Sequence, residues 1–371
     1  MNIKNKNYSK TYMLLTPQEI TKEYSNDYID SDIFKNILNS NGWKQIRYDE
    51  HINFYKLKQI GIGFIYSTGT ASYNKLIYKI PVFIKNLFEF KSHRFFTNKY
   101  EVYLKMKEYI GDDITKYMAE SWHLDDLEKL PENNVVYIAR PIEGFKGIGI
   151  ENIINNEELN NLKIKYKNII NTPKISYLNK KIYDKGIMIS RYFTNPLLFN
   201  KKKFHLRSYL LINKYWNKTL KKYKWSWSFF NQAKILTAKL EYKNGEWLNK
   251  DIHDTHINTT LDDYYFPQDL HLSDEIINEM FKNLLFICKN VFKIVKKSDI
   301  KTFDEVVNSF EILGLDFMIL DDYSIKLIEV NNKLGYGVLN KNSDKVKKYS
   351  FDFFEWIYEN GINPHEKDLI T

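Results

Sequence analysis

Two apolar runs near the C-terminal end of the chain predict a β-hairpin. Residues 317–320 and 325–330 are mostly apolar, and the polar segment 321–324 separates them. A turn symmetric about the centre of that segment would pair Leu320 with Ile325. This hairpin is the most informative pattern in the chain.

Acidic residues from the two strands meet in the predicted hairpin. The register places Asp316 across from Glu329, and the two-residue period of a strand puts Asn331 on the face of Glu329. Carboxylates about 5 Å apart repel each other unless a cation lies between them, and Mg²⁺ takes such oxygen donors when it also holds nucleotide phosphates. A solvated acidic hairpin is the alternative, but carboxylates are rarely placed beside a core without a partner. The apolar neighbours are Met318, Leu320, Leu327 and Val330.

The same periodicities predict the other elements of the chain. Strands are expected at residues 135–139, 186–193, 203–212 and 233–240, and helices at residues 98–109, 152–170, 274–297 and 349–358. Gly61 and Gly63 are expected to mark a turn between strands. The mixture indicates an α+β protein with no internal repeat.

Two segments carry cations that suit phosphate groups. The strand at 203–212 projects Lys203, His205 and Arg207 from one face and apolar residues from the other. An exposed basic strand face is the alternative interpretation.

The second segment is a glycine-rich loop that runs to Gly149 and contains Arg140, Gly144, Lys146 and Gly147. Its glycines would let the backbone approach phosphates closely. An ordinary glycine-rich turn is also compatible with this sequence, because the loop lacks the P-loop pattern.

Composition limits the classes of protein that need to be considered. The chain has 371 residues, of which 43% are hydrophobic and 16% aromatic, enough for a folded protein of two or three subdomains. The net charge of +9 suits an acidic partner, and its spread along the chain disfavours nucleic acid. The single cysteine, Cys288, excludes an internal disulfide and is expected to be buried in a reducing compartment. A polar N-terminus and the lack of a long apolar run predict a cytoplasmic protein with no membrane segment.

Five motifs in a fixed order resemble the tubulin–tyrosine ligase-like family of ATP-grasp ligases. They are Ile-Ala-Arg-Pro-x-x-Gly-x-Lys-Gly-x-Gly at 138–149, Arg-Tyr-Phe-x-x-Pro-Leu-Leu at 191–198, Lys-Phe-x-Leu-Arg at 203–207, Leu-Gly-Leu-Asp-Phe at 313–317 and Ile-Glu-Val-Asn at 328–331. The resemblance runs from about residue 95 to residue 331. It implies an ATP-grasp architecture in which two α/β lobes clamp ATP and Mg²⁺. We expect an N-terminal subdomain at 1–70, a central lobe at 71–195 and a C-terminal lobe with the metal site at 196–371.

The resemblance also implies roles for individual residues. Asp316, Glu329 and Asn331 would hold Mg²⁺, while Arg207, Glu329 and Lys234 would act in catalysis. Lys234 falls where the family usually has an arginine that helps to bind the acceptor or the acyl phosphate. Segment 190–193 would present backbone groups to the adenine. The implied nucleotide-binding residues are Arg140, Lys146, Gly147, Ser190, Arg191, Tyr192, Phe193, Lys203, His205, Asp316 and Asn331.

The sequence departs from the family pattern at four positions. Arg140 replaces a lysine, His205 replaces an aspartate, Ile148 replaces a glutamate, and His256 replaces an asparagine. His253 and His256 could instead suggest zinc, but no second pair of ligands accompanies them. The departures fit either a divergent ligase or a protein that has lost activity.

Two hypotheses follow from the resemblance. The first is an ATP-dependent carboxylate–amine ligase that joins a free amino acid to a glutamate of an acidic protein, with tubulin C-terminal tails as the leading substrate class. The second is a catalytically inactive module that binds a nucleotide or an acidic partner. A basic nucleic-acid-binding protein is less favoured, because no element concentrates the charge with stacking aromatic residues.

Overall fold

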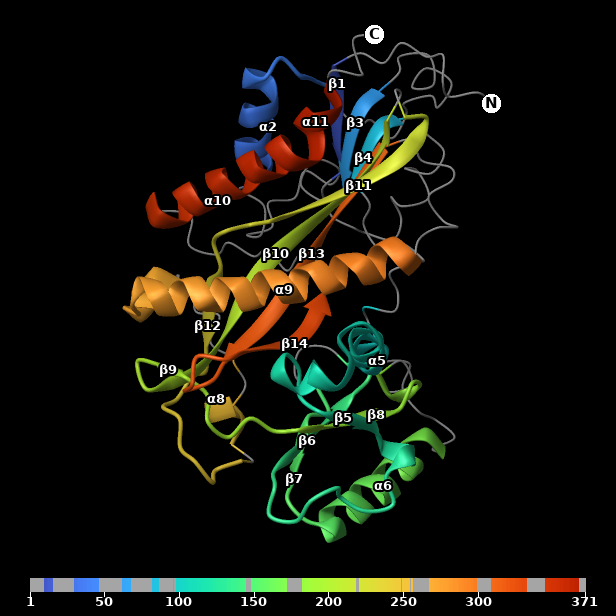
Figure 1. Cartoon of the computed structure of the whole chain (residues 1–371), viewed down its shortest axis with the longest axis vertical. Helices are drawn as coiled ribbons and strands as arrows, with labels where there is room; N and C mark the ends of the chain where they lie inside the picture. Colours follow the sequence, from blue (N-terminus) through green and yellow to red (C-terminus); the bar gives the residue numbers. More distant parts are fainter. Residues whose placement is uncertain are drawn as a thin grey trace.

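A computed structural model describes most of the chain. The described residues are 10–15, 30–46, 62–67, 82–86, 96, 98–144, 148–171, 182–217, 220–247, 249–253, 255, 267–298, 308–331 and 344–366. The molecule is elongated, with a small sheet at one end, a group of helices near the other and the long helix α9 (Asp274–Ser298) between them (Figure 1). Lys146, Gly147 and His256 lie outside the described residues.

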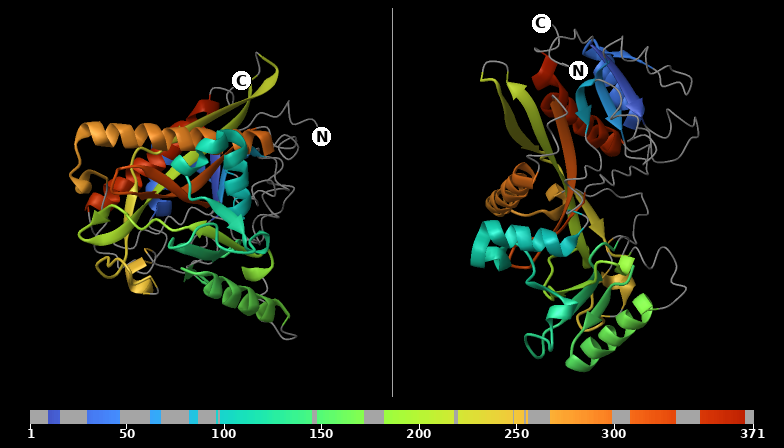
Figure 2. Two further views of the ribbon diagram at one scale, coloured as in Figure 1. Left: turned by 60° about the horizontal axis from the view of Figure 1, so that its bottom comes forward. Right: turned by 90° about the vertical axis from the view of Figure 1, so that its right-hand side faces the viewer.

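A large mixed sheet extends through most of the molecule. Its strands follow the order β11-β10-β13-β4-β3-β1-β2, with β9 and β12 also paired to β10 and β14 paired to β13. The long strands β10 and β13 connect the two ends of the molecule (Figure 2). The strands are β1 (Thr11–Leu15), β2 (Lys44–Gln45), β3 (Ile62–Ser67), β4 (Val82–Asn86), β9 (Leu198–Phe199), β10 (Lys202–Asn217), β11 (Lys222–Phe229), β12 (Lys234–Thr237), β13 (Asn308–Ile319) and β14 (Ile325–Asn331).

A second sheet has the strand order β5-β8-β6-β7. It comprises β5 (Ser121–His123), β6 (Tyr137–Pro141), β7 (Glu151–Ile153) and β8 (Ile187–Arg191). Helix α6 (Asn156–Asn171) packs on this sheet through Leu159 and Leu162. This small lobe lies at the lower end of the view in Figure 1.

Helices cover both faces of the large sheet. The remaining helices are α2 (Asp30–Ser40), α5 (Lys99–Ile110), α8 (Lys250–His253), α9 (Asp274–Ser298), α10 (Asp344–Ile357) and α11 (Asn363–Glu366). Short 3₁₀ turns occupy Gly111–Lys116, Leu124–Asp126 and Pro267–Leu270, and a π-helical turn occupies Tyr358–Ile362. No described helix is both long enough and apolar enough to cross a membrane.

The alternation along β10 determines which face each helix covers. Phe204, Leu206 and Leu210 share one core with α9, where Cys288 is fully buried as predicted. On the opposite face, Tyr209 and Leu211 share a second core with α2 and α10. Lys203, His205 and Arg207 continue this second face toward the small lobe, because strand residues alternate with period two. One face of β10 therefore changes from a hydrophobic core to a row of charged and polar groups.

The hairpin of β13 and β14 confirms one predicted pairing and corrects another. Asp316 does lie across from Glu329, but Ile319 rather than Leu320 pairs with Ile325. The turn is offset by one residue, and a β-bulge after Asp316 restores the register. Ile328 is the extra residue, because Phe317 pairs with Leu327.

Three further expectations differ from the structure. Residues 151–153 form β7, and α6 begins later because Asn155 and Glu158 form a capping box with the backbone nitrogens of Glu158 and Ile154. Gly63 lies inside β3 rather than in a turn. The aromatic segment before β12 forms the strand β11, which is absent from the expected set of strands. The subdomain boundaries expected near residues 70 and 195 stay predictions.

Candidate nucleotide site

The predicted site residues lie around a cavity of about 590 Å³ between the two sheets. Strands β6 and β7 of the small lobe line one side, and β10, β13 and β14 of the large sheet line the other. A smaller cavity of about 70 Å³ adjoins it toward residues 190–193. Both cavities are lined by Lys99, Ile138, Arg140, Tyr192, Lys203, Met318 and Ile328.

Four charged residues form one row across the large sheet. Lys234 on β12 pairs with Arg207 on β10, and Arg207 pairs with Asp316 on β13. Asp316 in turn pairs with Glu329 on β14. Directly paired residues share one face of a sheet, so two cations and two carboxylates lie side by side. The cross-strand pairings bring together the residues for which the sequence predicted catalysis.

Asn331 joins the two carboxylates. Its Nδ2 atom lies 3.1 Å from Asp316 Oδ2 and 3.1 Å from Glu329 Oε1. Two carboxylates and an amide are a donor set that suits a hard cation such as Mg²⁺. The residue types present therefore fit the predicted metal, but in this structure Asn331 turns its amide nitrogen, not its oxygen, toward the two carboxylates.

The β-bulge lets β14 contribute two consecutive residues to the cavity lining. Ile328 and Glu329 are neighbours in sequence, and both line the large cavity. In a regular strand, consecutive side chains would face opposite sides of the sheet. The extra residue therefore lets an apolar side chain and a carboxylate face the same cavity.

Arg207 holds Asp316 through a bidentate ion pair. Its Nη2 atom donates to Asp316 Oδ2 at 2.7 Å, and its Nε atom donates to Oδ1. Burial lowers the pKa of Arg207, but the charge and hydrogen bonds of Asp316 outweigh that effect and raise it above the usual range. His205 also lies close, with its Nε2 atom 3.6 Å from Asp316 Oδ1 and its Nδ1 atom hydrogen-bonded to Thr255. The histidine that replaces the family's aspartate therefore faces Asp316.

Lys99 is a site residue that the sequence analysis missed. Its Nζ atom donates to the carbonyl oxygen of Gly144 at 2.6 Å and lies 3.6 Å from Glu329 Oε2. Burial lowers the pKa of Lys99, and the positive charge of Arg140 adds to that effect, whereas Glu329 opposes it. One signal was present in the sequence, because Lys99 is the first residue of α5 and its charge opposes the helix dipole there.

Arg140 places a guanidinium at the wall that both cavities share. Burial lowers its pKa, and the negative charge of Glu329 opposes that effect. Its Nε atom is buried, and no described residue accepts a hydrogen bond from it. Buried donors normally have an acceptor, so this guanidinium suits a ligand that carries phosphate oxygens.

Lys203 lies at the same wall. Its Nζ atom donates to the hydroxyl of Tyr192 at 2.5 Å and lies 4.4 Å from the centre of the Tyr192 ring. Tyr192 in turn contacts His253. Three cations, namely Lys99, Arg140 and Lys203, thus line the same cavity as the two carboxylates.

The segment predicted to contact adenine lines the smaller cavity. Ser190, Arg191, Tyr192 and Phe193 all contribute to that lining. The Ser190 hydroxyl is buried and lies 2.8 Å from the hydroxyl of Ser121. The guanidinium of Arg191 forms an ion pair with the exposed carboxylate of Glu132.

Lys234 lies beside the site rather than on the cavity wall. Its side chain is 3% exposed, and its Nζ atom lies 5.3 Å from the centre of the Tyr349 ring on α10. Arg207 and Asn331 are also outside the cavity lining. Of the predicted catalytic residues, Glu329 borders the cavity.

The zinc alternative concerned His253 and His256, and His256 lies outside the described residues. No group of three or more His, Cys, Asp or Glu side chains converges within the described part of the chain. Both ring nitrogens of His253 instead have hydrogen-bond partners, Tyr192 and the carbonyl of Glu246.

The fold matches that of a solved ATP-grasp structure. The C-terminal domain of Pby1 from K. lactis, an ATP-grasp enzyme that interacts with the mRNA decapping enzyme Dcp2, aligns with a TM-score of 0.60. The alignment covers 95% of this chain and 93% of that domain at 15% identity. The chain therefore has an ATP-grasp fold, and the cavity described above lies between its two sheets.

The model of the tubulin-tyrosine ligase family matches residues 115–334. That match covers more than half of the chain, so the protein belongs to the tubulin-tyrosine ligase family. It is 26% identical over 198 residues to a probable tubulin–tyrosine ligase of Schizosaccharomyces pombe, covering 51% of this chain and 46% of the relative. It is also 26% identical over 233 residues to the inactive polyglycylase TTLL10 of Homo sapiens, covering 57% of this chain and 32% of the relative. The chain thus spans less than half the length of either relative.

Proposed function

We propose that this protein is an ATP- and Mg²⁺-dependent ligase that joins a free amino acid to a glutamate carboxylate of an acidic protein. The observation that carries the proposal is the meeting of paired carboxylates with three cations around one cavity. Phosphoryl transfer needs this combination, because catalysis comes mainly from positioning and from stabilising negative charge.

The proposed reaction has two steps. A carboxylate oxygen of the acceptor attacks the γ-phosphorus of ATP, the bond to the bridging oxygen breaks, and ADP leaves. The amine nitrogen of the free amino acid then attacks the acyl carbon, phosphate leaves, and the amine loses a proton. Lys99, Arg140 and Lys203 would bind and orient the phosphates, and Arg207 would hold Asp316 in place. Asp316, Glu329 and Asn331 would hold Mg²⁺, which would neutralise part of the phosphate charge.

An acidic acceptor, with tubulin C-terminal tails as the leading class, fits the charge of the protein. The net charge is +9, and the solvent-exposed side of α9 presents a row of lysines. These are Lys282, Lys289, Lys293, Lys296 and Lys297. Such a face accelerates encounter with an acidic partner at low salt. We expect Lys289→Glu together with Lys293→Glu to slow association with microtubules at low salt. An unchanged association rate would show that the lysines of α9 do not attract the acceptor.

A second candidate is a module that binds nucleotide without turnover. The ion pair of Arg207 already occupies both oxygens of Asp316, and Asn331 points its amide nitrogen, not its oxygen, at the carboxylates. One relative is itself named an inactive enzyme.

Turnover separates the two candidates. The protein is incubated with microtubules, Mg²⁺–ATP and each labelled amino acid, and the acceptor is examined by mass spectrometry. The ligase predicts a labelled acceptor peptide that Glu329→Gln abolishes. ATP binding without any labelled product would favour the binding module instead.

A further inference from the structure

A directed chain of hydrogen bonds leads from Lys203 into the loop before α8. The carbonyl oxygen of Glu246 lies 3.0 Å from His253 Nε2 and can only accept, so Nε2 carries the proton. The Nδ1 atom of His253 is then an acceptor, and the Tyr192 hydroxyl 2.7 Å away donates to it. The Tyr192 oxygen is left to accept from the Lys203 ammonium at 2.5 Å. Every donor in this chain therefore has one defined acceptor.

The groups around the chain keep His253 neutral. Burial lowers the pKa of His253 to about 4, and the positive charge of Lys203 adds to that effect. Burial also raises the pKa of the Tyr192 hydroxyl far above its usual range. The tyrosine thus keeps its proton and the histidine does not gain one near neutral pH. The direction of each hydrogen bond is fixed.

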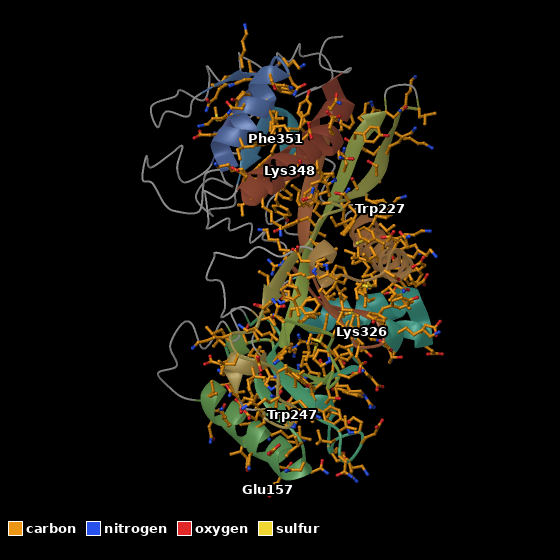
Figure 3. All side chains as sticks on the ribbon, turned by 90° about the vertical axis from the view of Figure 1, so that its left-hand side faces the viewer. Glu157, Trp227, Trp247, Lys326, Lys348 and Phe351 are labelled. Atoms are coloured by element: carbon orange, nitrogen blue, oxygen red, sulfur yellow. The ribbon has the colours of Figure 1, made fainter. Side chains whose placement is uncertain are left out.

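Aromatic packing and backbone contacts fix the loop that carries His253. The rings of Tyr192, Tyr242 and Trp247 lie within 5.8 Å of the His253 ring, measured between centres. The loop is joined to the small lobe by a hydrogen bond from Asn152 on β7 to the carbonyl of Trp247. Trp247 is labelled in Figure 3, close to the small lobe. His253 is therefore held by three aromatic rings and by a loop that is hydrogen-bonded to the small lobe.

We propose that Tyr192 and His253 are positioning residues that hold the Lys203 ammonium at the wall shared by the two cavities, where it meets the phosphates of the nucleotide. The cavity geometry favours this role, because Tyr192 and Lys203 line both cavities and His253 lines the larger one. Donation of the Tyr192 hydroxyl proton to His253 Nδ1 also makes the tyrosine oxygen a better acceptor for the ammonium. This inference rests on the proposed nucleotide site.

Tyr192→Phe tests the inference because it removes one atom and keeps the ring over which Lys203 lies. The affinities for ATP and for adenosine are measured by isothermal titration. A misplaced ammonium should weaken ATP binding about tenfold, which is equivalent to about 1.4 kcal/mol. Adenosine has no phosphates, so its affinity should not change. A general disturbance of the site would weaken both ligands.

Tyr242→Phe is the matched control. Tyr242 also contacts His253, but its hydroxyl donates to the carbonyl of Thr194 at 2.7 Å, and the residue is outside the cavity lining. We expect its ATP affinity to equal that of the wild type. His253→Asn, which keeps an acceptor near the Nδ1 position, should retain more ATP affinity than His253→Phe.

The outcomes separate this inference from the proposed function. Equal ATP affinity of wild type and Tyr192→Phe would overturn the positioning role and leave the nucleotide site intact. A parallel loss of ATP and adenosine affinity in Tyr192→Phe would also overturn it. Failure of the wild type to bind ATP at all would overturn the nucleotide site, and the inference with it.

Discussion

Arg207→Met is expected to destabilise the free protein by about 3–5 kcal/mol. Asp316 is 1% exposed and Arg207 is 8% exposed, so their ion pair is shielded from water. Removing one partner of a buried pair leaves a buried charge without compensation, which typically costs about 3–5 kcal/mol. Methionine keeps much of the volume of the arginine stem, so the decrease in the free energy of unfolding should come mainly from the unpaired charge of Asp316.

The assay is urea unfolding of the free protein at neutral pH, with Arg191→Met as the matched control. Arg191 also forms a two-contact ion pair, but with Glu132, whose side chain is 54% exposed. An exposed pair is worth about 0–1 kcal/mol, so the control should lose little stability. Adding Asp316→Asn to Arg207→Met should recover much of the loss, because the unpaired charge disappears. Equal losses in Arg207→Met and Arg191→Met would refute the reasoning.

Three other substitutions test separate parts of the account. Gly186→Ala should lower the free energy of unfolding in denaturant titrations by more than about 1 kcal/mol. Gly186 has a φ of +91°, and a methyl group there would overlap the His123 ring. A variant as stable as the wild type would contradict this expectation. Burial lowers the pKa of His365 to about 4 from 6.5, so this histidine binds fewer protons in the folded protein than in the unfolded chain. The contribution of His365 to wild-type stability should therefore fall by roughly 3 kcal/mol as the pH drops from 6.5 to 4. Titrations of His365→Gln, which keeps an amide near Asn213, should show a shallower fall, and an unchanged pH dependence would argue against the assignment. Lys99→Met should weaken ATP binding in isothermal titration while leaving adenosine binding unchanged, and equal ATP affinity would remove Lys99 from the site.

The sequence predicted the central pairing of the hairpin but not its turn or its bulge. The pairing of Asp316 with Glu329 was correct, although the turn was placed one residue away. The shifted turn and the bulge cancel each other. The turn takes one more residue from β13 than predicted, and the bulge at Ile328 adds one residue to β14, so Asp316 still pairs with Glu329. Turn type and bulges depend on local backbone conformation, such as the positive φ of Tyr323, which alternation of polar and apolar residues does not encode.

Other parts of the site depended on contacts between distant segments. Lys99 precedes Glu329 by more than two hundred residues, and only the packing of α5 near β14 brings them together. The hydrogen bond from Tyr192 to His253 also joins two separate segments. The strand β11 was missed although its aromatic residues alternate with lysines and serines, the two-residue period of a half-buried strand. For Lys99 and for the pair of Tyr192 and His253, the signal lies in tertiary packing rather than in local sequence.

The central claim is that one cavity forms a Mg²⁺–ATP site. Its carboxylates are Asp316 and Glu329, and its cations are Lys99, Arg140 and Lys203. The most direct test of this claim is isothermal titration of ATP into the wild-type protein and into Glu329→Gln, each with and without Mg²⁺. The account predicts saturable binding at one site of the wild type, strengthened by Mg²⁺, and the loss of that strengthening in Glu329→Gln. Absence of ATP binding, or a Mg²⁺ effect that is unchanged in Glu329→Gln, would contradict it.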